Sequence, residues 1–573
     1  MSALAILTPE VVRTETADGF VLEARTPLPN GVATIPDWLD HWATVAPERT
    51  FLAERDESGA WRTLSYAETH TKVGAVAALL EARGAEKNRP ICVLSDNSLA
   101  HAIVMLAGMH LGVPVSSISP AYGTASSTFG RLRHIASLLS PSVLFVESRA
   151  PYEKALAAID APNVIASSDV EAANGAPPSR AEIDASTIAK VLFTSGSTGE
   201  PKGVVNTHRM LTANQESLAA TWPFLEDEPP VVVDWLPWSH TFGGNHNLNL
   251  VLRNGGTLYV DRGRPAPGLV DVSLKNMADV GPTIWFNVPR GFDQAVTSLE
   301  KDAGLARAAF RNLRVLFYAA AALGPVTRAR LEKVAASVGR SDLFFTSAWG
   351  STETSPLATS AHFETATTGV LGVPVPGVAI KLARVAGRHE IRVRGPNVTP
   401  GYWTKGGGLE PAKLDEEGFL PTGDAGTLVD ENDPAKGIAF AGRISENFKL
   451  SSGTWVVVGA VRLAVVDACA PFVLDAVVAG ADRESLGVLL VPSPAGISGL
   501  SRPELETKLR ECITRYDAAH PGSSERIARA LVLDRPLSLD DGETTDKGYT
   551  NQRRVLECRR DDVARLFASP PGE

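Results

Sequence analysis

Cysteine and aromatic residues are scarce in this chain of 573 residues, which has 4 Cys and only 6 % Phe, Trp and Tyr together. The four cysteines are Cys92, Cys469, Cys512 and Cys558. They form no closely spaced pair of the kind that binds zinc or carries redox chemistry. We therefore expect free thiols in a reduced, cytoplasmic compartment.

A surplus of basic residues is also absent, because 55 Lys and Arg stand against 65 Asp and Glu and give a net charge of −10. Nucleic-acid-binding proteins usually show the opposite balance, so we expect no nucleic-acid partner. The longest apolar segment, residues 102–115, contains His110 and is shorter than the ~20 residues of a membrane-spanning helix. The apolar residues 3–7 follow no basic residue and end at Pro9, so we expect neither a signal peptide nor a membrane partner.

What the chain does contain is a large apolar fraction, 44 %, which is enough to bury several cores. Between about residues 89 and 349, β-rich runs such as ICVLSD, TIWFNVP and RVLFYA alternate with Ala- and Leu-rich segments. This alternation is typical of stacked α/β layers with buried strands. Beyond about residue 360, hairpin-like strands predominate.

The pattern predicts an α/β fold with two domains. A large N-terminal domain is expected over residues 1–442, with a β-rich subdomain at about 360–442, and a smaller α+β domain over 443–573. Two capping boxes, Ser65 with Glu68 and Ser501 with Glu504, predict helix starts. A single closing helix is expected over about 551–567.

The strongest local signal is the segment VLFTSGSTGEPKGVV, residues 191–205. It is a β-rich run that breaks into a loop whose hydroxyls and backbone N–H groups suit phosphate oxygens, with Lys202 adding charge. Glu200 and Pro201 separate this lysine from the last glycine, so the loop is not a Walker A motif. An ordinary surface turn is the alternative. The candidate phosphate ligands are Thr194, Ser195, Gly196, Ser197, Thr198, Gly199 and Lys202.

This loop resembles the signature loop of the adenylate-forming superfamily of acyl-CoA synthetases, luciferases and peptide-synthetase adenylation domains. Further motifs follow in the order of that superfamily: WGSTE at residues 349–353, PTGD at 421–424 and GR at 442–443. The resemblance spans residue 38 to the last helix. It implies the superfamily's fold with a mobile C-terminal domain, and ATP, Mg²⁺ and coenzyme A as the small molecules bound.

The resemblance also implies roles for the nucleotide side of the site. Trp349, where most members have Tyr, would stack on adenine, and Thr352 would donate to the α-phosphate. Glu353 would hold Mg²⁺, Asp424 would accept both ribose hydroxyls, and Arg443 would contact ribose or phosphate. The residues alone leave other roles open: Glu353 as a solvated carboxylate, Trp349 in the core, Asp424 capping its own turn and Arg443 in a salt bridge.

The segment WLPWSHTFGGNHN, residues 235–247, resembles the part of the superfamily that lines the acyl pocket. His240 would be its gate, with Trp235, Trp238 and Phe242 as candidate walls beside the small Gly243, although core packing is a strong alternative for all three aromatic residues. The small residues at 319–325 would pass between adenine and the acyl group. In that segment Ala320 would face the acyl group and Ala321 the nucleotide.

The C-terminal motifs depart most from the general pattern. At the position where the superfamily usually has a hinge Asp or Lys, this chain has Ser445. Lys449 and Gly453 would lie beside coenzyme A. Lys547, between Asp546 and Gly548, would be the terminal catalytic lysine of adenylation. The segments ENFKLSSGTWV and TDKGYTNQR look most like the feruloyl-CoA synthetase branch, which attaches coenzyme A to phenylpropenoic acids.

The resemblance implies an ATP- and Mg²⁺-dependent aromatic acid–CoA ligase in which His240, Thr352, Glu353 and Lys547 serve catalysis. A fatty acyl-CoA ligase of the same fold is one alternative, and a non-catalytic nucleotide-binding relative is another. The sequence leaves open the ring substituents and chain length of the acid, the pathway and the oligomeric state.

Overall fold

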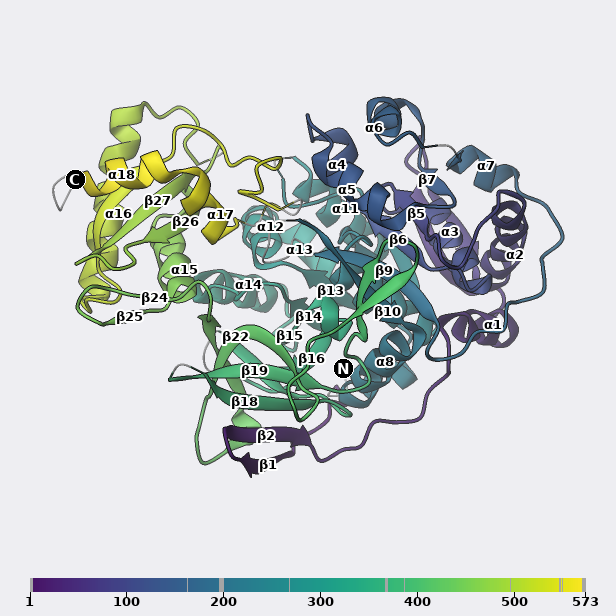
Figure 1. Cartoon of the computed structure of the whole chain (residues 1–573), viewed down its shortest axis with the longest axis horizontal. Helices are drawn as coiled ribbons and strands as arrows, with labels where there is room; N and C mark the ends of the chain where they lie inside the picture. Colours follow the sequence, from purple (N-terminus) through teal and green to yellow (C-terminus); the bar gives the residue numbers. More distant parts are fainter. Residues whose placement is uncertain are drawn as a thin grey trace. The chain divides into compact units, whose positions relative to one another are not determined.

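A computed structural model describes residues 4–161, 163–194, 200–266, 268–365, 369–385, 387–494, 496–545, 548 and 550–568 (Figure 1). The chain forms two compact units. Unit 1 comprises Met1–Ala383, Arg392–Pro421 and Leu428–Ala439. Unit 2 comprises Arg384–Ile391, Thr422–Thr427 and Phe440–Glu573. The expected boundary between residues 442 and 443 stays a prediction.

A parallel sheet in unit 1 has the strand order β15-β14-β13-β11-β12-β3. Its strands are β3 (Thr50–Arg55), β11 (Val231–Asp234), β12 (Thr257–Val260), β13 (Ile284–Asn287), β14 (Val315–Tyr318) and β15 (Phe344–Gly350). The antiparallel β4 (Trp61–Ser65) pairs with β3, and β16 (Leu357–Ser360) pairs with β15. Because parallel strands end at the same edge, the loops after β11, β13, β14 and β15 lie together.

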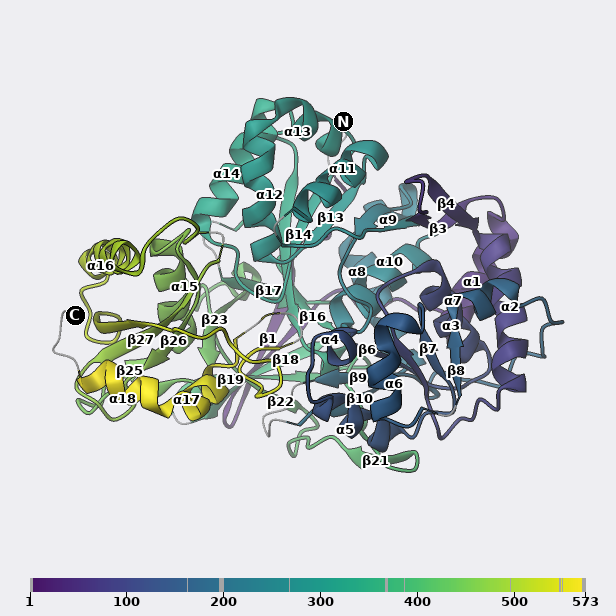
Figure 2. The same ribbon diagram turned by 90° about the horizontal axis from the view of Figure 1, so that it is seen from above.

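Four helices cover this sheet, and Figure 2 shows them beside β13 and β14. They are α11 (Val270–Val280), α12 (Pro289–Lys301), α13 (Ala303–Phe310) and α14 (Pro325–Ser337). Their buried side chains form one core with the sheet, in which the rings of Trp285 and Phe292 meet edge to face at 4.7 Å. The helices thus fix the strands whose ends carry the predicted site.

A second sheet of unit 1 has the strand order β21-β20-β10-β9-β6-β5-β7-β8. Its strands are β5 (Ile91–Leu94), β6 (Val115–Ile118), β7 (Leu144–Val146), β8 (Val164–Ala166), β9 (Ile188–Thr194), β10 (Lys202–Thr207), β20 (Gly401–Thr404) and β21 (Gly408–Pro411). The strands β9 and β10 are antiparallel and place Lys202 opposite Thr194. The candidate phosphate loop therefore joins two paired strands.

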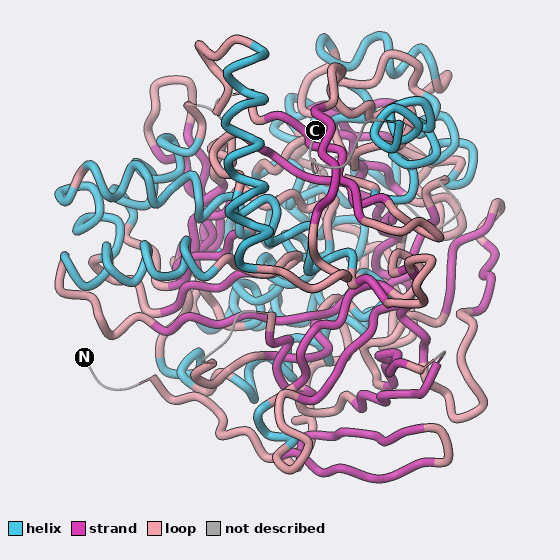
Figure 3. The backbone as a smooth tube through the Cα atoms, turned by 90° about the vertical axis from the view of Figure 1, so that its left-hand side faces the viewer, coloured by secondary structure: helices cyan, strands magenta, loops and turns pink. Residues whose placement is uncertain are grey.

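The helices around the second sheet follow the sequence pattern. Ser65 caps α2 (Tyr66–Ala82) in the predicted capping box with Glu68. The apolar segment at 102–115 forms the buried helix α3 (Leu99–His110) and then leads into β6. Twelve of the fourteen residues of α8 (His208–Thr221) are buried. Figure 3 shows how strands and helices alternate along the chain.

Antiparallel strands follow residue 360, as the hairpin-like pattern predicts. In unit 1, β1 (Val11–Thr16) pairs with β2 (Gly19–Ala24), and β2 pairs with β18 (Ala379–Val385). The strand β17 (Val370–Pro374) pairs with β16 and with β23 (Ile438–Arg443). Two further strands, β19 (Arg388–Arg394) and β22 (Leu420–Leu428), carry the chain between the units.

Unit 2 is built on the sheet β26-β27-β28 with helices on both faces (Figure 1). The strands are β26 (Val473–Ala479), β27 (Leu486–Pro492) and β28 (Ile527–Val532). Alternate residues of β27 face different cores, because side chains alternate along a strand. Val488 and Leu490 pack with α15 (Val458–Ala468) and α16 (Arg502–Ala519), whereas Leu489 packs with Leu566 of α18 (Arg560–Ala568). The predicted capping box of Ser501 with Glu504 begins α16.

The prediction of a single closing helix is wrong. The chain forms α17 (Gln552–Cys558) and then α18, with a break at Arg559. The side chain of Arg559 is buried, where it pairs with Glu543 at 2.5 Å and donates to the carbonyl of Pro536 at 2.9 Å. The backbone N–H of Arg559 still donates to the carbonyl of Val555 at 2.8 Å, so the break is a local distortion of the backbone at Arg559, with φ −105° and ψ 36°.

Two expectations from the composition can be compared with the structure. Cys92, Cys469 and Cys512 are buried and Cys558 is exposed, and all four described cysteines carry free thiols. None of the helices in the described part of the chain has the length and apolar character needed to cross a bilayer.

Candidate functional site

Several predicted site residues meet at one edge of the parallel sheet. Trp235 directly follows β11, Ala320 and Ala321 follow β14, and the turn with Thr352 and Glu353 follows β15. Adjacent parallel strands carry these loops, so motifs far apart in sequence lie side by side. In open α/β sheets this edge is where ligands bind.

The turn after β15 is tightly held. Gly350 has no room for a side chain, because a Cβ there would lie 1.6 Å from the carbonyl oxygen of Pro356. The short helix η3 (Thr352–Thr354) follows, and Thr399 donates to the carbonyl of Glu353 at 2.8 Å. Asn214 of α8 donates to the carbonyl of Leu357 at 2.9 Å. The backbone of the turn is thus held by helix α8 and by the segment that precedes β20.

Two non-glycine residues at this edge have left-handed backbone, Ala320 with φ 72° and Ser355 with φ 73°. Such conformations are costly for residues with a side chain and cluster at ligand sites. Ala320 and Ala321 are exposed, as a segment that approaches a ligand requires.

The Glu353 carboxylate is half-buried, and no other described residue donates a hydrogen bond to it or forms an ion pair with it. Across the described part of the chain, no group of three or more His, Cys, Asp or Glu could by itself hold a metal ion. Mg²⁺ is commonly bound by one or two carboxylates together with substrate phosphates. A single half-buried carboxylate without a partner among the described residues fits that chemistry.

Tyr402 of β20, which the sequence does not single out, lies near both Lys202 and Glu353. Tyr402 is the cross-strand partner of Val204, and Lys202 Nζ lies 5.5 Å from the centre of its ring. Burial, together with the charges of Glu353 and Glu410, raises the pKa of Tyr402 to about 12. The ring therefore supports the lysine by a cation–π contact.

Six predicted site residues cannot be placed. Lys547 and the loop residues Ser195, Gly196, Ser197, Thr198 and Gly199 lie outside the described residues. Thr194 and Lys202, on either side of the loop, are described and lie opposite each other.

The predicted acyl segment forms a π-helix, η2 (Thr241–Asn247), directly after His240. A Cβ on Gly243 would lie 2.2 Å from the carbonyl oxygen of Leu236, and one on Gly244 would lie 2.5 Å from that of Trp238. These glycines let η2 pack directly on the chain that follows β11. π-Helices are rare and are frequent at functional sites.

A buried lysine, which the sequence analysis missed, anchors this π-helix. Lys190 of β9 is 2 % exposed, and its Nζ donates to Gly244 O at 2.8 Å and Asn245 Oδ1 at 3.2 Å. Burial lowers the pKa of Lys190 to about 7. Gln215 of α8 donates to the carbonyl of Asn245 at 3.0 Å. The sequence signal that could have predicted this buried lysine is its place within the apolar run IAKVLF, residues 188–193.

The aromatic residues of the acyl segment have different surroundings. Trp238 is 1 % exposed and meets the ring of His101 edge to face at 5.0 Å, so it belongs to the core. Trp235 is half-buried and donates to Asn287 Oδ1 at 3.3 Å, at the end of β13. Phe242 joins a ring cluster with Phe286 and Phe317. His240 is half-buried at the start of η2.

In unit 2, the two predicted ribose-binding residues lie together. Arg443 Nε is 3.4 Å from Asp424 Oδ1, with the arginine side chain 62 % exposed and the aspartate 14 %. The turn at Gly423 has φ 75°, its N–H donates to Glu390 at 3.3 Å, and its carbonyl accepts from Ile444 at 2.8 Å. The two motifs are therefore parts of one local arrangement.

The predicted coenzyme A segment of unit 2 is a hairpin of β24 (Phe448–Lys449) and β25 (Trp455–Val456). Lys449 faces Trp455 across it, with Nζ 5.0 Å from the ring centre. Gly453, in the exposed turn, has φ 83°, and no described atom comes within 4 Å of where its Cβ would stand. Ser445 is exposed and precedes the hairpin.

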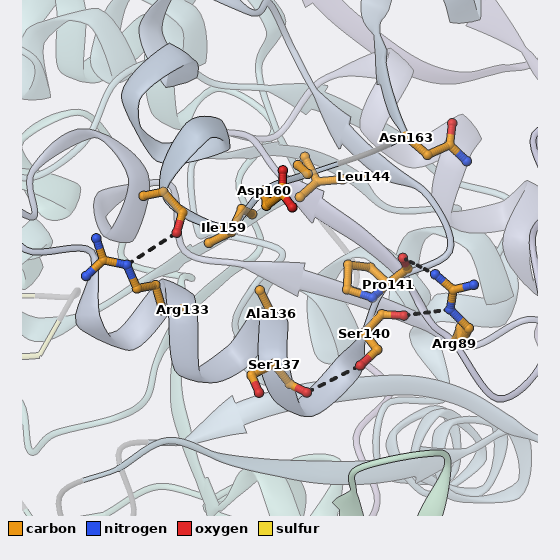
Figure 4. Close-up of a pocket in the computed structure, with 12 residues that line it drawn as sticks. Arg89, Arg133, Ala136, Ser137, Ser140, Pro141, Leu144, Ile159, Asp160 and Asn163 are labelled. Carbon is orange, nitrogen blue, oxygen red and sulfur yellow. Dashed lines mark hydrogen bonds between the residues drawn. The ribbon is translucent and has the colours of Figure 1, made fainter.

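A hollow of about 440 Å³ lies elsewhere in unit 1 (Figure 4). Arg89 and Arg133 at its wall already donate to the backbone carbonyls of Ser140 at 2.9 Å and Ala158 at 3.2 Å. Among the residues that line it is none of the predicted site residues. It is therefore separate from the candidate site.

The comparison with protein families agrees with this arrangement. A family model described as AMP-binding enzyme matches residues 39–403, which is more than half of the chain, and one described as AMP-binding enzyme C-terminal domain matches 450–570. The chain belongs to the AMP-binding enzyme family. The resemblance to adenylate-forming enzymes is thus confirmed at family level.

Among curated proteins, a long-chain-fatty-acid–CoA ligase of Yersinia pestis is 29 % identical over 249 residues. The match spans 42 % of this chain and 42 % of the ligase, so it covers less than half of that relative's length.

Two solved structures share the fold. ATP-bound MatB from Rhodopseudomonas palustris is 21 % identical, with a TM-score of 0.70 over 92 % of this chain and 99 % of MatB. The anthranilate CoA ligase AuaEII with anthranoyl-AMP is 19 % identical, with a TM-score of 0.73 over 94 % and 99 %. The predicted fold, a large α/β domain with a smaller C-terminal domain, is confirmed.

Replacing Tyr402 by Leu removes the ring beside the Lys202 ammonium. We expect the Kd of ATP to rise about 2- to 30-fold, because a cation–π contact is worth about 0.5–2 kcal/mol. Tyr402→Phe keeps the ring and should stay within about twofold of the unsubstituted protein. Isothermal titration calorimetry measures both. An equal loss of ATP affinity in the two variants would show that the Tyr402 hydroxyl, and not its ring, supports ATP binding.

Proposed function

We propose that this protein is an AMP-forming ligase that activates an aromatic carboxylic acid with ATP and joins it to coenzyme A. The observation that carries the proposal is the convergence of the loops after β11, β14 and β15 at one edge of the parallel sheet. Membership of the AMP-binding enzyme family supports it.

The reaction has two steps. A carboxylate oxygen of the acid attacks the α-phosphorus of ATP, and pyrophosphate leaves with the electrons of the broken P–O bond. The thiolate of coenzyme A then attacks the acyl carbon of the mixed anhydride, and AMP leaves. No covalent bond to the protein is needed, so the side chains act by positioning and by offsetting charge.

The nucleotide roles are part of the proposal. Trp349 stacks on adenine and Thr352 donates to the α-phosphate, both at the end of β15. Lys202, supported by Tyr402, offsets charge on the departing phosphates. Asp424 accepts the ribose hydroxyls, and Arg443, 3.4 Å away, contacts the ribose or a phosphate.

Glu353 holds Mg²⁺, which when bound neutralises charge on ATP. Its half-buried, unpaired carboxylate supports this role, as does the fixed backbone of its turn. The turn requires no rearrangement to present the carboxylate, which is how a preorganised site stabilises charge.

Different residues of the C-terminal domain serve the two steps of the reaction. Lys547 balances the charge on carboxylate and α-phosphate during adenylation. The hairpin with Lys449 and Gly453 serves the transfer to coenzyme A, and Ser445 is the hinge. The open turn at Gly453, with no side chain, leaves room for the pantetheine arm.

The aromatic substrate is proposed from the composition of the acyl segment. Trp235, Phe242, Phe286 and Phe317 bring flat rings to η2 and the strand ends around it. Ring faces and edges favour a planar acyl group of the hydroxycinnamic, feruloyl type. The long-chain-fatty-acid–CoA ligase among the relatives supports the competing fatty acyl substrate.

A panel of acids tests the proposed function. We expect ferulate and 4-hydroxycinnamate to support ATP–pyrophosphate exchange and to give the coenzyme A thioester, identified by its mass, at least tenfold more efficiently than palmitate. Faster turnover of palmitate would favour the fatty acyl-CoA ligase. Absence of turnover with every acid would favour the non-catalytic nucleotide-binding relative.

Glu353→Gln tests the metal role. We expect at least a hundredfold loss of pyrophosphate exchange with unchanged thermal stability, because a neutral amide of the same size binds Mg²⁺ poorly. Glu410→Gln is the matched control, since both carboxylates face Tyr402 but Glu410 is exposed on β21, and it should keep nearly full activity. Similar losses in both variants would contradict the role assigned to Glu353.

Lys547→Ala and Gly453→Trp test the division of the two steps. Lys547→Ala should lose acyl-adenylate formation but still transfer a supplied acyl-adenylate to coenzyme A. Gly453→Trp should form the adenylate and lose the transfer. Gly453→Ala controls for the strain of a side chain at φ 83°, because it adds little bulk. Loss of the same step in both variants would refute the division.

A further inference from the structure

His246, in the π-helix η2, carries a buried nitrogen without a partner. The residue is 1 % exposed, and no atom of the described residues hydrogen-bonds to its Nε2. Its ring stacks on Phe317 at 5.0 Å and meets Phe286 at 5.5 Å and Phe242 at 5.8 Å edge to face. The nitrogen therefore lies among aromatic rings.

A chain of hydrogen bonds decides which ring nitrogen carries the proton. Asn247 Nδ2 donates to Asp234 Oδ2 at 2.8 Å, and this turns Asn247 Oδ1 toward His246 Nδ1, 2.9 Å away. An amide oxygen only accepts, so Nδ1 carries the hydrogen and Nε2 is an acceptor. Burial lowers the pKa of His246 to about 4, which keeps the ring neutral at neutral pH.

An acceptor without a partner in apolar surroundings is unfavourable, and buried polar groups in proteins are nearly always paired. A partner suited to Nε2 supplies a hydrogen-bond donor and fits between flat rings. A phenolic hydroxyl has both properties, whereas a fatty acyl chain or an unsubstituted ring has no donor to offer. The ring of Phe242, a proposed wall of the acyl pocket, meets the ring of His246 edge to face at 5.8 Å.

We propose that His246 Nε2 accepts a hydrogen bond from a hydroxyl group on the ring of the acyl substrate, and so selects hydroxylated aromatic acids. This inference rests on the proposed function, because it concerns the acid which that function activates. Asp234 and Asn247 act as positioning residues that fix the tautomer of His246.

The test compares acids that differ only in the hydrogen-bond donor: 4-hydroxycinnamate, 3-hydroxycinnamate, 4-methoxycinnamate and cinnamate. Assays at pH 8 keep the Asp234 carboxylate ionised, since burial raises its pKa to about 7. We expect the unsubstituted protein to use one hydroxycinnamate with a kcat/KM at least tenfold above those of cinnamate and 4-methoxycinnamate. This part of the test needs no variant.

His246→Phe keeps an aromatic ring and removes the acceptor. We expect it to lose at least tenfold in kcat/KM for the preferred hydroxycinnamate while cinnamate stays within about threefold. His362→Phe is the matched control, because His362 is also buried with an Nε2 that lacks a hydrogen-bond partner among the described residues, but it follows β16 rather than belonging to η2. It should leave the ratio between the two acids unchanged.

The outcomes separate the inference from the function on which it rests. Equal use of cinnamate and the hydroxycinnamates by the unsubstituted protein would overturn the inference and leave the ligase function standing, with a buried water as the partner of Nε2. A His246→Phe variant that loses both acids equally would also overturn it. Failure to turn over any aromatic acid would contradict the proposed function itself.

Discussion

Parallel hydrogen bonding between β11, β13, β14 and β15 is the constraint from which the candidate site follows. The strands β11, β13 and β14 are short and largely buried, and the segments after β11, β14 and β15 are those that the sequence pattern singles out. Paired parallel strands must end at one edge of the sheet. This pairing brings together the predicted acyl segment at 235–247, the small residues at 319–325 and the turn with Glu353. The helices α11 to α14 hold the strands in register from one core.

The second sheet adds the charged part of the site through β9, β10 and β20. Lys202 begins β10, and Tyr402 of β20 supports it, while Lys190 of β9 reaches under η2. The backbone of the Glu353 turn is held by Thr399. Lys190 and Thr399 thus hold η2 and the turn through hydrogen bonds to backbone carbonyls.

The sequence predicts the parts of this arrangement that depend on local chemistry. Capping boxes at Ser65 and Ser501 mark helix starts because the interaction spans three residues, and the motif order places Glu353 after a strand. The sequence does not predict the roles of Lys190, Tyr402 and His246, because each role depends on partners that lie far away along the chain. The break at Arg559 in the helix expected at 551–567 is a local distortion that the residue pattern does not mark.

The π-helix η2 is held on one side by Lys190 and on the other by Asp234 through Asn247, and both ionisable groups are fully buried. Asp234 has a raised folded-state pKa, so between pH 3.8 and about 7 the folded chain binds a proton that the unfolded chain lacks, and its contribution to stability falls as pH rises. Lys190 has a lowered folded-state pKa, so between about 7 and 10.5 the unfolded chain binds the extra proton and its contribution rises with pH. The two contributions are therefore jointly lowest near neutral pH, so the two buried groups that anchor η2 stabilise the fold less there than at lower or higher pH.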